Sequence, residues 1–169
     1  RNVLISGNPA KGNDEGATLI GPTDPAKVAC IDRANTNYES TNIELDEGDY
    51  VTLRHLTLRG ARMGLWVHNN SDHFTATDLI VSDNTQDGIL IESDATGTLV
   101  DRLTAFNNAG TGISISAPIV RLSASEAYSN GTGIYVSASN GAVVGSADAT
   151  GNPDLSLGLG NKVYNNRYT

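Results

Sequence analysis

The chain has 169 residues, of which 38% are hydrophobic and 5% aromatic, and it carries a formal charge of −8 with a pI near 4.6. This acidity argues against nucleic acid or an anionic membrane surface as a partner, and it disfavours a polyanionic glycan unless calcium bridges the charges. No apolar run approaches the length of a membrane span, and the single Cys30 excludes an internal disulfide framework.

The first part of the chain is irregular. Turns rich in Gly, Pro, Asn and Asp separate three short apolar runs, at Val3–Ile5, Ala17–Ile20 and Val28–Ile31. Short apolar runs bounded by turn residues are typical of strands. We therefore interpret residues 1–42 as the first coils of a repeating structure, with loop insertions around residues 8–16 and 32–41.

Further along, the chain repeats one short phrase, in which a glycine precedes a strand-like triplet. The four copies are Gly64-Leu65-Trp66-Val67, Gly88-Ile89-Leu90-Ile91, Gly112-Ile113-Ser114-Ile115 and Gly133-Ile134-Tyr135-Val136. Their glycines are 24, 24 and 21 residues apart (88 − 64, 112 − 88 and 133 − 112). A period in this range marks a solenoid, in which each repeat buries its apolar face only by stacking on its neighbours.

Each repeat contains about three short strand-like runs and no 3.6-residue apolar stripe. Leucine-rich repeats would need a helical stretch, and propeller blades would need about 40 residues each. The sequence therefore predicts one all-β domain over residues 1–169, a parallel β-helix with no evident helical cap. Its regular coils span residues 43–158, and a terminal partial coil spans residues 159–169. About seven coils at about 4.8 Å per rung would form a column roughly 30–35 Å long.

Aligning the repeats predicts which residues share a position in successive coils. One inward column reads Leu58, Val81, Ala105, Ala127 and Ala149, and the column beside it places Phe106 next to Tyr128. A second marker is a column of asparagines, namely Asn84, Asn108, Asn130 and Asn152. Stacked asparagines form hydrogen-bonded ladders, and Asn tolerates the left-handed backbone of tight corners. We expect a structural role for this asparagine ladder.

The segment Asp49–Gly60, followed by the repeated Asn…Gly-Ile units, resembles the right-handed parallel β-helix superfamily. That superfamily includes pectate lyases, polygalacturonases, mannuronan epimerases and uncharacterised bacterial surface proteins. The resemblance covers nearly the whole chain from about Ile43. It implies an extracellular or cell-surface location, with bacterial origin, and either a polysaccharide or another copy of the chain as the partner.

The catalytic motifs of these enzymes are absent. Asn84-Thr85-Gln86-Asp87 is similar to the Asn-Thr-Asp segment of polygalacturonases, but Gln86 interrupts it and no Asp-Asp pair occurs. The Arg-x-Pro-x-x-Arg motif of pectate lyases is missing, and Asp24-Pro25 is followed by Ala26 where an epimerase would have His. Asp87 is interpreted as a solvated turn residue. These absences favour a non-catalytic role.

The best candidate site lies on the outward side of the repeated phrase. The middle residue of each phrase should face solvent, which gives a column of Trp66, Leu90, Ser114, Tyr135 and Ser156. Exposed Trp66 and Tyr135 are candidate platforms for the apolar face of a sugar. His68 and Glu92 should lie one rung apart beside Trp66, where they could grip a hydroxyl or act as a weak candidate acid–base pair. The alternative is that a loop covers Trp66 and that His68 and Glu92 form an ordinary surface pair.

No metal or cofactor is expected. Asp46, Glu47 and Asp49 cluster before a strand, and turn backbones could supply further oxygens for calcium. However, no spaced calcium-binding motif is present.

Three functions remain open. The first is a non-catalytic extracellular module with a structural or glycan-binding role. The second is a self-stacking protomer of a filament or surface layer, because an uncapped solenoid exposes strand edges. The third is a polysaccharide lyase, hydrolase or epimerase, or a fragment of one.

Overall fold

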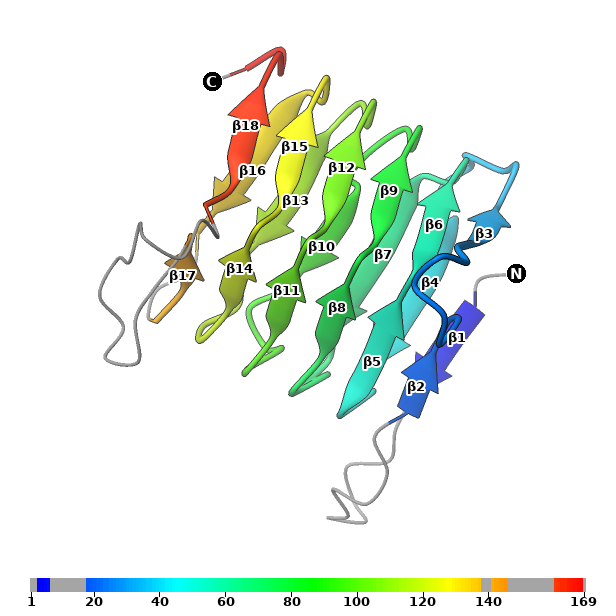
Figure 1. Ribbon diagram of the computed structural model, residues 1–169, viewed down its shortest axis with the longest axis vertical. Coiled ribbons are helices and arrows are strands. Elements are labelled where there is room, and N and C mark those ends of the chain that lie inside the picture. The colour runs from blue at the N-terminus through cyan, green and yellow to red at the C-terminus, as the bar shows by residue number, and fades with distance from the viewer. Residues whose placement is uncertain (1–2, 7–17, 138–140, 146–159, 169) are drawn as a thin grey trace.

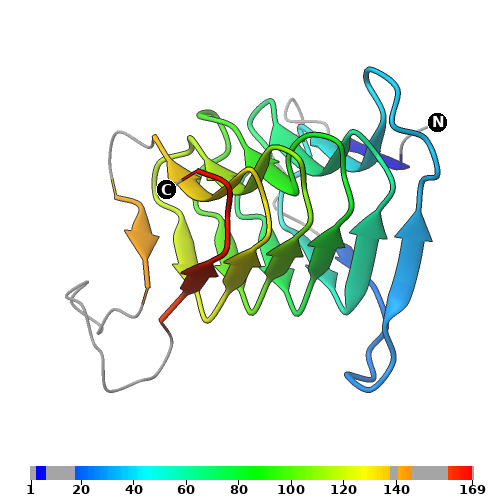
Figure 2. The ribbon, with the colours of Figure 1, turned by 90° about the horizontal axis from the view of Figure 1, so that it is seen from above.

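The computed structural model describes residues 3–6, 18–137, 141–145 and 160–168, with side chains described from residue 20 onward. These residues form three parallel β-sheets that wrap around a common core (Figures 1 and 2). The strands of each sheet lie side by side along one axis, with β1–β3 at one end and β16–β18 at the other. The predicted all-β parallel β-helix is confirmed.

Each of the three sheets has six strands in the described part of the chain. Sheet A contains β1 (Val3–Ser6), β4 (Thr41–Asp46), β7 (Met63–His68), β10 (Ile89–Ile91), β13 (Thr111–Ile115) and β16 (Thr132–Val136). Sheet B contains β2 (Thr18–Ile20), β5 (Val51–Arg54), β8 (Thr75–Thr77), β11 (Leu99–Asp101), β14 (Arg121–Ser123) and β17 (Val143–Val144). Sheet C contains β3 (Ala29–Asp32), β6 (Leu56–Arg59), β9 (Ile80–Ser82), β12 (Thr104–Phe106), β15 (Glu126–Tyr128) and β18 (Lys162–Tyr164).

The chain visits the sheets in the order A, B, C and then rises by one rung to sheet A again. The described residues therefore form six rungs, or five full turns from β1 to β16, rather than about seven coils. The apolar runs before residue 42 account for part of the difference. They form β1, β2 and β3, which lie in three different sheets and make a single rung.

Alternation along the strands fills the core. In sheet C, Leu58, Val81, Ala105 and Ala127 occupy one column and are fully buried. Equivalent inward columns of sheets A and B supply Ile, Leu and Val side chains that are likewise removed from water. Because side chains of a strand alternate between its two faces, the intervening residues face outward on all three sheets.

Two of the three corners of each rung have a recurring feature. Between sheets B and C the first residue after each sheet B strand has a positive φ, as at His55, Asp78, Arg102 and Ala124. Between sheets C and A the corner carries the asparagine ladder, in which Asn84 Nδ2 donates to Asn108 Oδ1 at 2.9 Å. Asn108 Nδ2 in turn donates to Asn130 Oδ1 at 3.0 Å. All three asparagines are buried, so the ladder satisfies backbone and side-chain groups that water cannot reach.

The last turn differs from the predicted register. Asn130 Nδ2 donates to Asn166 Oδ1 at 3.2 Å, so Asn166 occupies the place in the ladder that was assigned to Asn152. Likewise Val163 extends the inward column where Ala149 was expected, and Tyr164 stacks on Tyr128. The step from Asn130 to Asn166 is 36 residues instead of 22. Ala149, Asn152 and Ser156 lie outside the described residues.

The described residues contain strands and turns and no helix. Consequently none of them forms a helix long and apolar enough to cross a membrane.

Candidate functional site

The candidate site lies on the outer face of sheet A. Pairing between neighbouring strands places Glu44, Trp66, Leu90, Ser114 and Tyr135 in one column. Trp66 and Tyr135 are therefore on the same face of the same sheet, three rungs apart. The position predicted for Ser156 in this column lies outside the described residues.

Trp66 and His68 form a stacked pair on β7. They are two residues apart on one strand, and their ring centroids lie 3.9 Å apart with an interplanar angle of 13°. Trp66 is partly buried, whereas His68 is only 7% exposed. The indole ring is thus held in one orientation by its own strand.

Two glutamates from the neighbouring rungs, Glu92 and Glu44, contact this pair from either side. Trp66 Nε1 donates to Glu92 Oε1 of the rung above at 2.8 Å. His68 Nε2 lies 3.2 Å from Glu44 Oε1 of the rung below. Since a carboxylate oxygen can only accept, Nε2 is the protonated nitrogen of the His68 ring. The four side chains, from β4, from β7 and from the residue that follows β10, therefore form one connected cluster.

This arrangement differs from the expected pairing of His68 with Glu92. Each of the two is engaged by another partner, and stacking on Trp66 closes His68 off from solvent. Register alone placed the residues correctly on the sheet, but it could not give the side-chain rotamers. Glu44 was not singled out from the sequence, although its position one rung below Trp66 follows from the same register.

The rest of the face carries an aromatic ring and hydroxyl groups. Tyr135 on β16 is 53% exposed. The hydroxyls of Ser116 and Ser137, which follow β13 and β16, lie 2.9 Å apart. Ser114 is buried at 7% exposure. Tyr135 is thus the more accessible of the two predicted aromatic platforms.

Sheet A and the turns that follow it are acidic. Residues 41–50, 63–74 and 88–98 contain no Lys or Arg, but they contain Glu44, Asp46, Glu47, Asp49, Asp72, Glu92 and Asp94. Within the part of the chain that the structure describes, no group of three or more His, Cys, Asp or Glu side chains is placed to hold a metal ion. This face is therefore electrostatically unfavourable for polyanions.

Asp87, at the start of the sheet A face, is not the solvated turn residue that was expected. Its Oδ1 accepts a hydrogen bond from the backbone N–H of Thr111 at 2.7 Å. Burial raises the pKa of the Asp87 carboxyl, although the Thr111 hydrogen bond and the charge of Arg62 oppose that shift. Through this hydrogen bond the Asp87 side chain stabilises the corner of the next rung.

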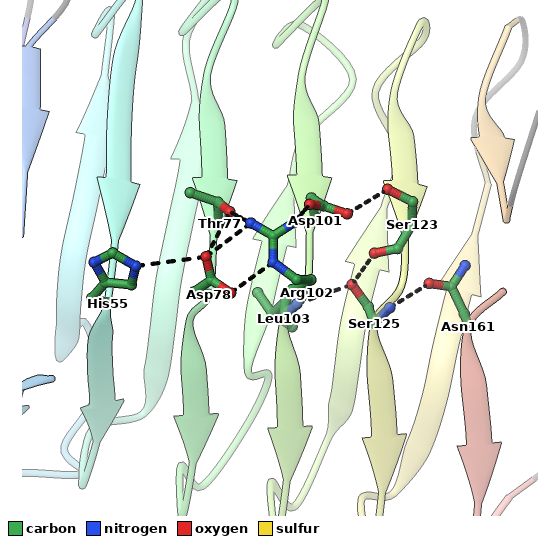
Figure 3. Close-up of polar contacts among 9 residues, drawn as sticks. All are labelled: His55, Thr77, Asp78, Asp101, Arg102, Leu103, Ser123, Ser125 and Asn161. Carbon is green, nitrogen blue, oxygen red and sulfur yellow. Dashed lines mark hydrogen bonds and ion pairs between the residues drawn. The ribbon is translucent and has the colours of Figure 1, made fainter. Parts of the chain in front are cut away.

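A second polar cluster, at the corner between sheets B and C, was missed from the sequence (Figure 3). The corner residues His55, Asp78 and Arg102 lie in successive rungs, so that an acidic side chain stands between two basic ones. Arg102 Nε and Nη2 donate to the two oxygens of Asp78 at 2.7 and 2.9 Å, and a further contact joins Arg102 to Asp101. The hydrogen bond from Arg102 lowers the pKa of the Asp78 carboxyl.

His55 extends this cluster to the first rung. Its Nδ1 donates to the carbonyl oxygen of Pro22 at 2.7 Å, and its Nε2 lies 3.7 Å from Asp78 Oδ2. Aligning the first residue after each sheet B strand would have revealed this column. The residues of this column differ in type, so no repeated residue marks the column in the sequence.

The chain belongs to the right-handed β-helix family, whose model matches residues 29–168. No curated protein and no solved structure matches the chain. The family membership agrees with the fold and fixes its hand, whereas the activity has to be argued from the site.

Proposed function

We propose that the chain is a non-catalytic β-helix module of an extracellular or cell-surface protein, and that the outer face of sheet A binds a neutral glycan. The observation that carries the proposal is the Trp66 ring, held on a parallel sheet by His68 on one face and by Glu92 at its N–H. A ring fixed in this way loses little conformational entropy when a sugar stacks on it.

The rest of the face supplies the groups that sugars need. Tyr135 offers a second exposed ring, and Ser116 and Ser137 offer hydroxyls for hydrogen bonds with sugar hydroxyls. The carboxylates and the absence of Lys and Arg in the described sheet A segments favour a neutral chain over a polyuronate.

Binding is favoured over catalysis because the candidate acid–base residues are already engaged. His68 faces Glu44 and is almost completely buried, and Glu92 accepts from Trp66. A general acid or base must reach the reacting group through a hydrogen bond or one water. Neither residue is positioned to do this without breaking the cluster.

The direct test is affinity electrophoresis in gels that contain neutral polysaccharides. Trp66→Ala should abolish retention, whereas Trp66→Phe, which keeps a ring but loses the bond to Glu92, should retain part of it. The matched control is Tyr128→Ala, which removes an outward ring from sheet C. Trp66→Ala should cost no more than about 1–2 kcal/mol of stability, because Trp66 is only partly buried. Retention equal to wild type in Trp66→Ala would refute the proposal.

A further inference from the structure

Two aromatic rings of the sheet A face lie in one column along the axis of the solenoid. Pairing of β7 with β10, of β10 with β13 and of β13 with β16 places Tyr135 in the column of Trp66, three rungs away. At about 4.8 Å per rung, the Cα atoms of the two residues are about 14 Å apart. Tyr135 faces outward because Ile134 and Val136, on either side of it, continue inward columns.

The indole ring of Trp66 is oriented along the same axis. Trp66 stacks on His68, which lies two residues further along β7, so the plane of the indole ring lies across the strand. The solenoid axis is perpendicular to the strands (Figure 1), and the ring therefore extends along that axis. The hydrogen bond from Trp66 Nε1 to Glu92 agrees with this orientation, because Glu92 follows the strand of the next rung. A sugar ring stacked on the indole can thus belong to a chain that runs parallel to the axis.

The two positions between these aromatic rings carry neither a ring nor a charge. They are Leu90 and Ser114, and Ser114 is only 7% exposed. Past β10 sheet A is neutral, since residues 111–117 and 132–137 contain no Asp, Glu, Lys or Arg. Hydroxyl groups, which both donate to and accept from sugar hydroxyls, recur instead in these two segments. They belong to Thr111, Ser114, Ser116, Thr132, Tyr135 and Ser137.

We propose that the glycan bound by sheet A is an extended chain that lies along the solenoid axis, with one sugar ring on Trp66 and the third ring beyond it on Tyr135. The ligand is then a neutral 1,4-linked chain whose bridging bonds are both equatorial, as in β-linked glucans and xylans. Each pyranose ring of such a chain advances it by about the height of one rung. The direction of the ligand, its minimum length of four sugar rings and its linkage are thereby added to the proposed function, on which they rest.

The linkage follows from the positions of the two aromatic rings. Trp66 and Tyr135 lie in one column, so a single glycan can reach both only if it stays above that column for three rungs. Chains with α-1,4 links curve into a helix and leave the column before the third ring. A chain that ran across the strands would contact Trp66 but could not reach Tyr135.

The length of the ligand allows a direct test. We expect the affinity for cello- or xylo-oligosaccharides, measured by isothermal titration calorimetry, to rise about tenfold between the trisaccharide and the tetrasaccharide, because only the longer chain reaches both rings. Further sugar residues should add little. Malto-oligosaccharides, which contain the same sugar as cello-oligosaccharides in α-1,4 linkage, should show no such step.

Replacements of Tyr135 assign this step to one ring. Tyr135→Ala should reduce the ratio of the tetrasaccharide affinity to the trisaccharide affinity to about one, whereas Tyr135→Phe, which keeps the ring, should preserve the step. Tyr135 is 53% exposed, so neither variant should disturb the fold. Tyr128→Ala is the matched control, because it removes an outward ring from sheet C and should leave the step in place.

The outcomes separate this proposal from the function on which it rests. Binding whose affinity does not depend on length, or a tetrasaccharide step that persists in Tyr135→Ala, would overturn the axial chain and leave glycan binding at Trp66 standing. A step of equal size with malto-oligosaccharides would overturn the assigned linkage. Absence of binding at every length in both β-linked series would overturn the proposed function together with the axial chain.

Discussion

At the scale of single residues, glycine and asparagine fit together at each rung of sheet A. A Cβ atom on Gly64 would lie 2.5 Å from the carbonyl oxygen of Gly88 and 3.0 Å from Asn84 Nδ2. One on Gly88 would lie 2.5 Å from the carbonyl oxygen of Gly112 and 2.9 Å from Asn108 Nδ2. The repeated glycine therefore makes room for the backbone of the next rung and for the ladder amide. This explains why the two markers recur in phase along the sequence.

In one rung the asparagine stands at the glycine position and a small residue stands at the ladder position. In the rung of β4 the ladder position is Ala61, whose N–H donates to Asn84 Oδ1 as an asparagine backbone does elsewhere. The position that corresponds to Gly64 is Asn42, whose Nδ2 lies 3.5 Å from the same Oδ1. Asn42 thus supplies from the strand the amide that Ala61 lacks, although its own buried Oδ1 has no hydrogen-bond partner among the described residues.

This exchange predicts non-additive mutations. Asn42→Gly should cost about 1–2 kcal/mol by removing a buried hydrogen bond, and Ala61→Asn alone should destabilise by crowding Asn42. The double variant restores the arrangement of the other rungs and should be more stable than either single variant. Urea unfolding of all four proteins measures the coupling. Additive losses would mean that Asn42 does not replace the ladder amide.

At the scale of the elements, the corners between sheets B and C are held by charge as well as by backbone conformation. Asp78 accepts two hydrogen bonds from Arg102, one rung above, and faces His55, one rung below. The folded-state pKa of Asp78 is lowered, so its ionised form stabilises the fold at pH values above the unfolded pKa of about 4. That contribution is lost as the pH falls through the lowered pKa.

Replacement of Arg102 by Met should therefore destabilise the protein at pH 7 and have little effect near pH 2. The loss at pH 7 should be below about 1 kcal/mol, because the Arg102 side chain is 54% exposed and solvent screens the pair. Arg121→Met is a suitable control, since Arg121 is exposed on β14 and forms no ion pair among the described residues. An equal effect of Arg102→Met at both pH values, measured by urea unfolding, would contradict the electrostatic explanation.

The strands of the middle rungs could be predicted from the sequence because their signals are local and repeated. The Gly-Ile phrases mark β10, β13 and β16, and the Phe106–Tyr128 stack follows from counting residues between the markers. The last rung could not be placed in this way. Asn152 follows Asn130 at the expected interval, but an insertion moves the true ladder position to Asn166. Residue spacing does not reveal an insertion whose own sequence matches the pattern of the repeat.

At the scale of the whole molecule, the candidate site was predicted in position but not in contacts. Register fixed Trp66, His68, Glu92 and Tyr135 on one face of one sheet. The carboxylate that each ring contacts depends on side-chain rotamers. The observed contacts Trp66–Glu92 and His68–Glu44 are as compatible with this register as the expected contact between His68 and Glu92. Periodicity therefore predicted the architecture better than the chemistry.

The central claim is that the sheet A face around Trp66 binds neutral glycan, and intrinsic fluorescence can test this claim directly. Trp66 is the only tryptophan of the chain, so its fluorescence reports on this face alone. Titration with neutral oligosaccharides should give a saturable change in emission, and polygalacturonate should give none. Glycan retention in affinity gels without any change in Trp66 emission would contradict the account, because the ligand would then bind elsewhere on the molecule.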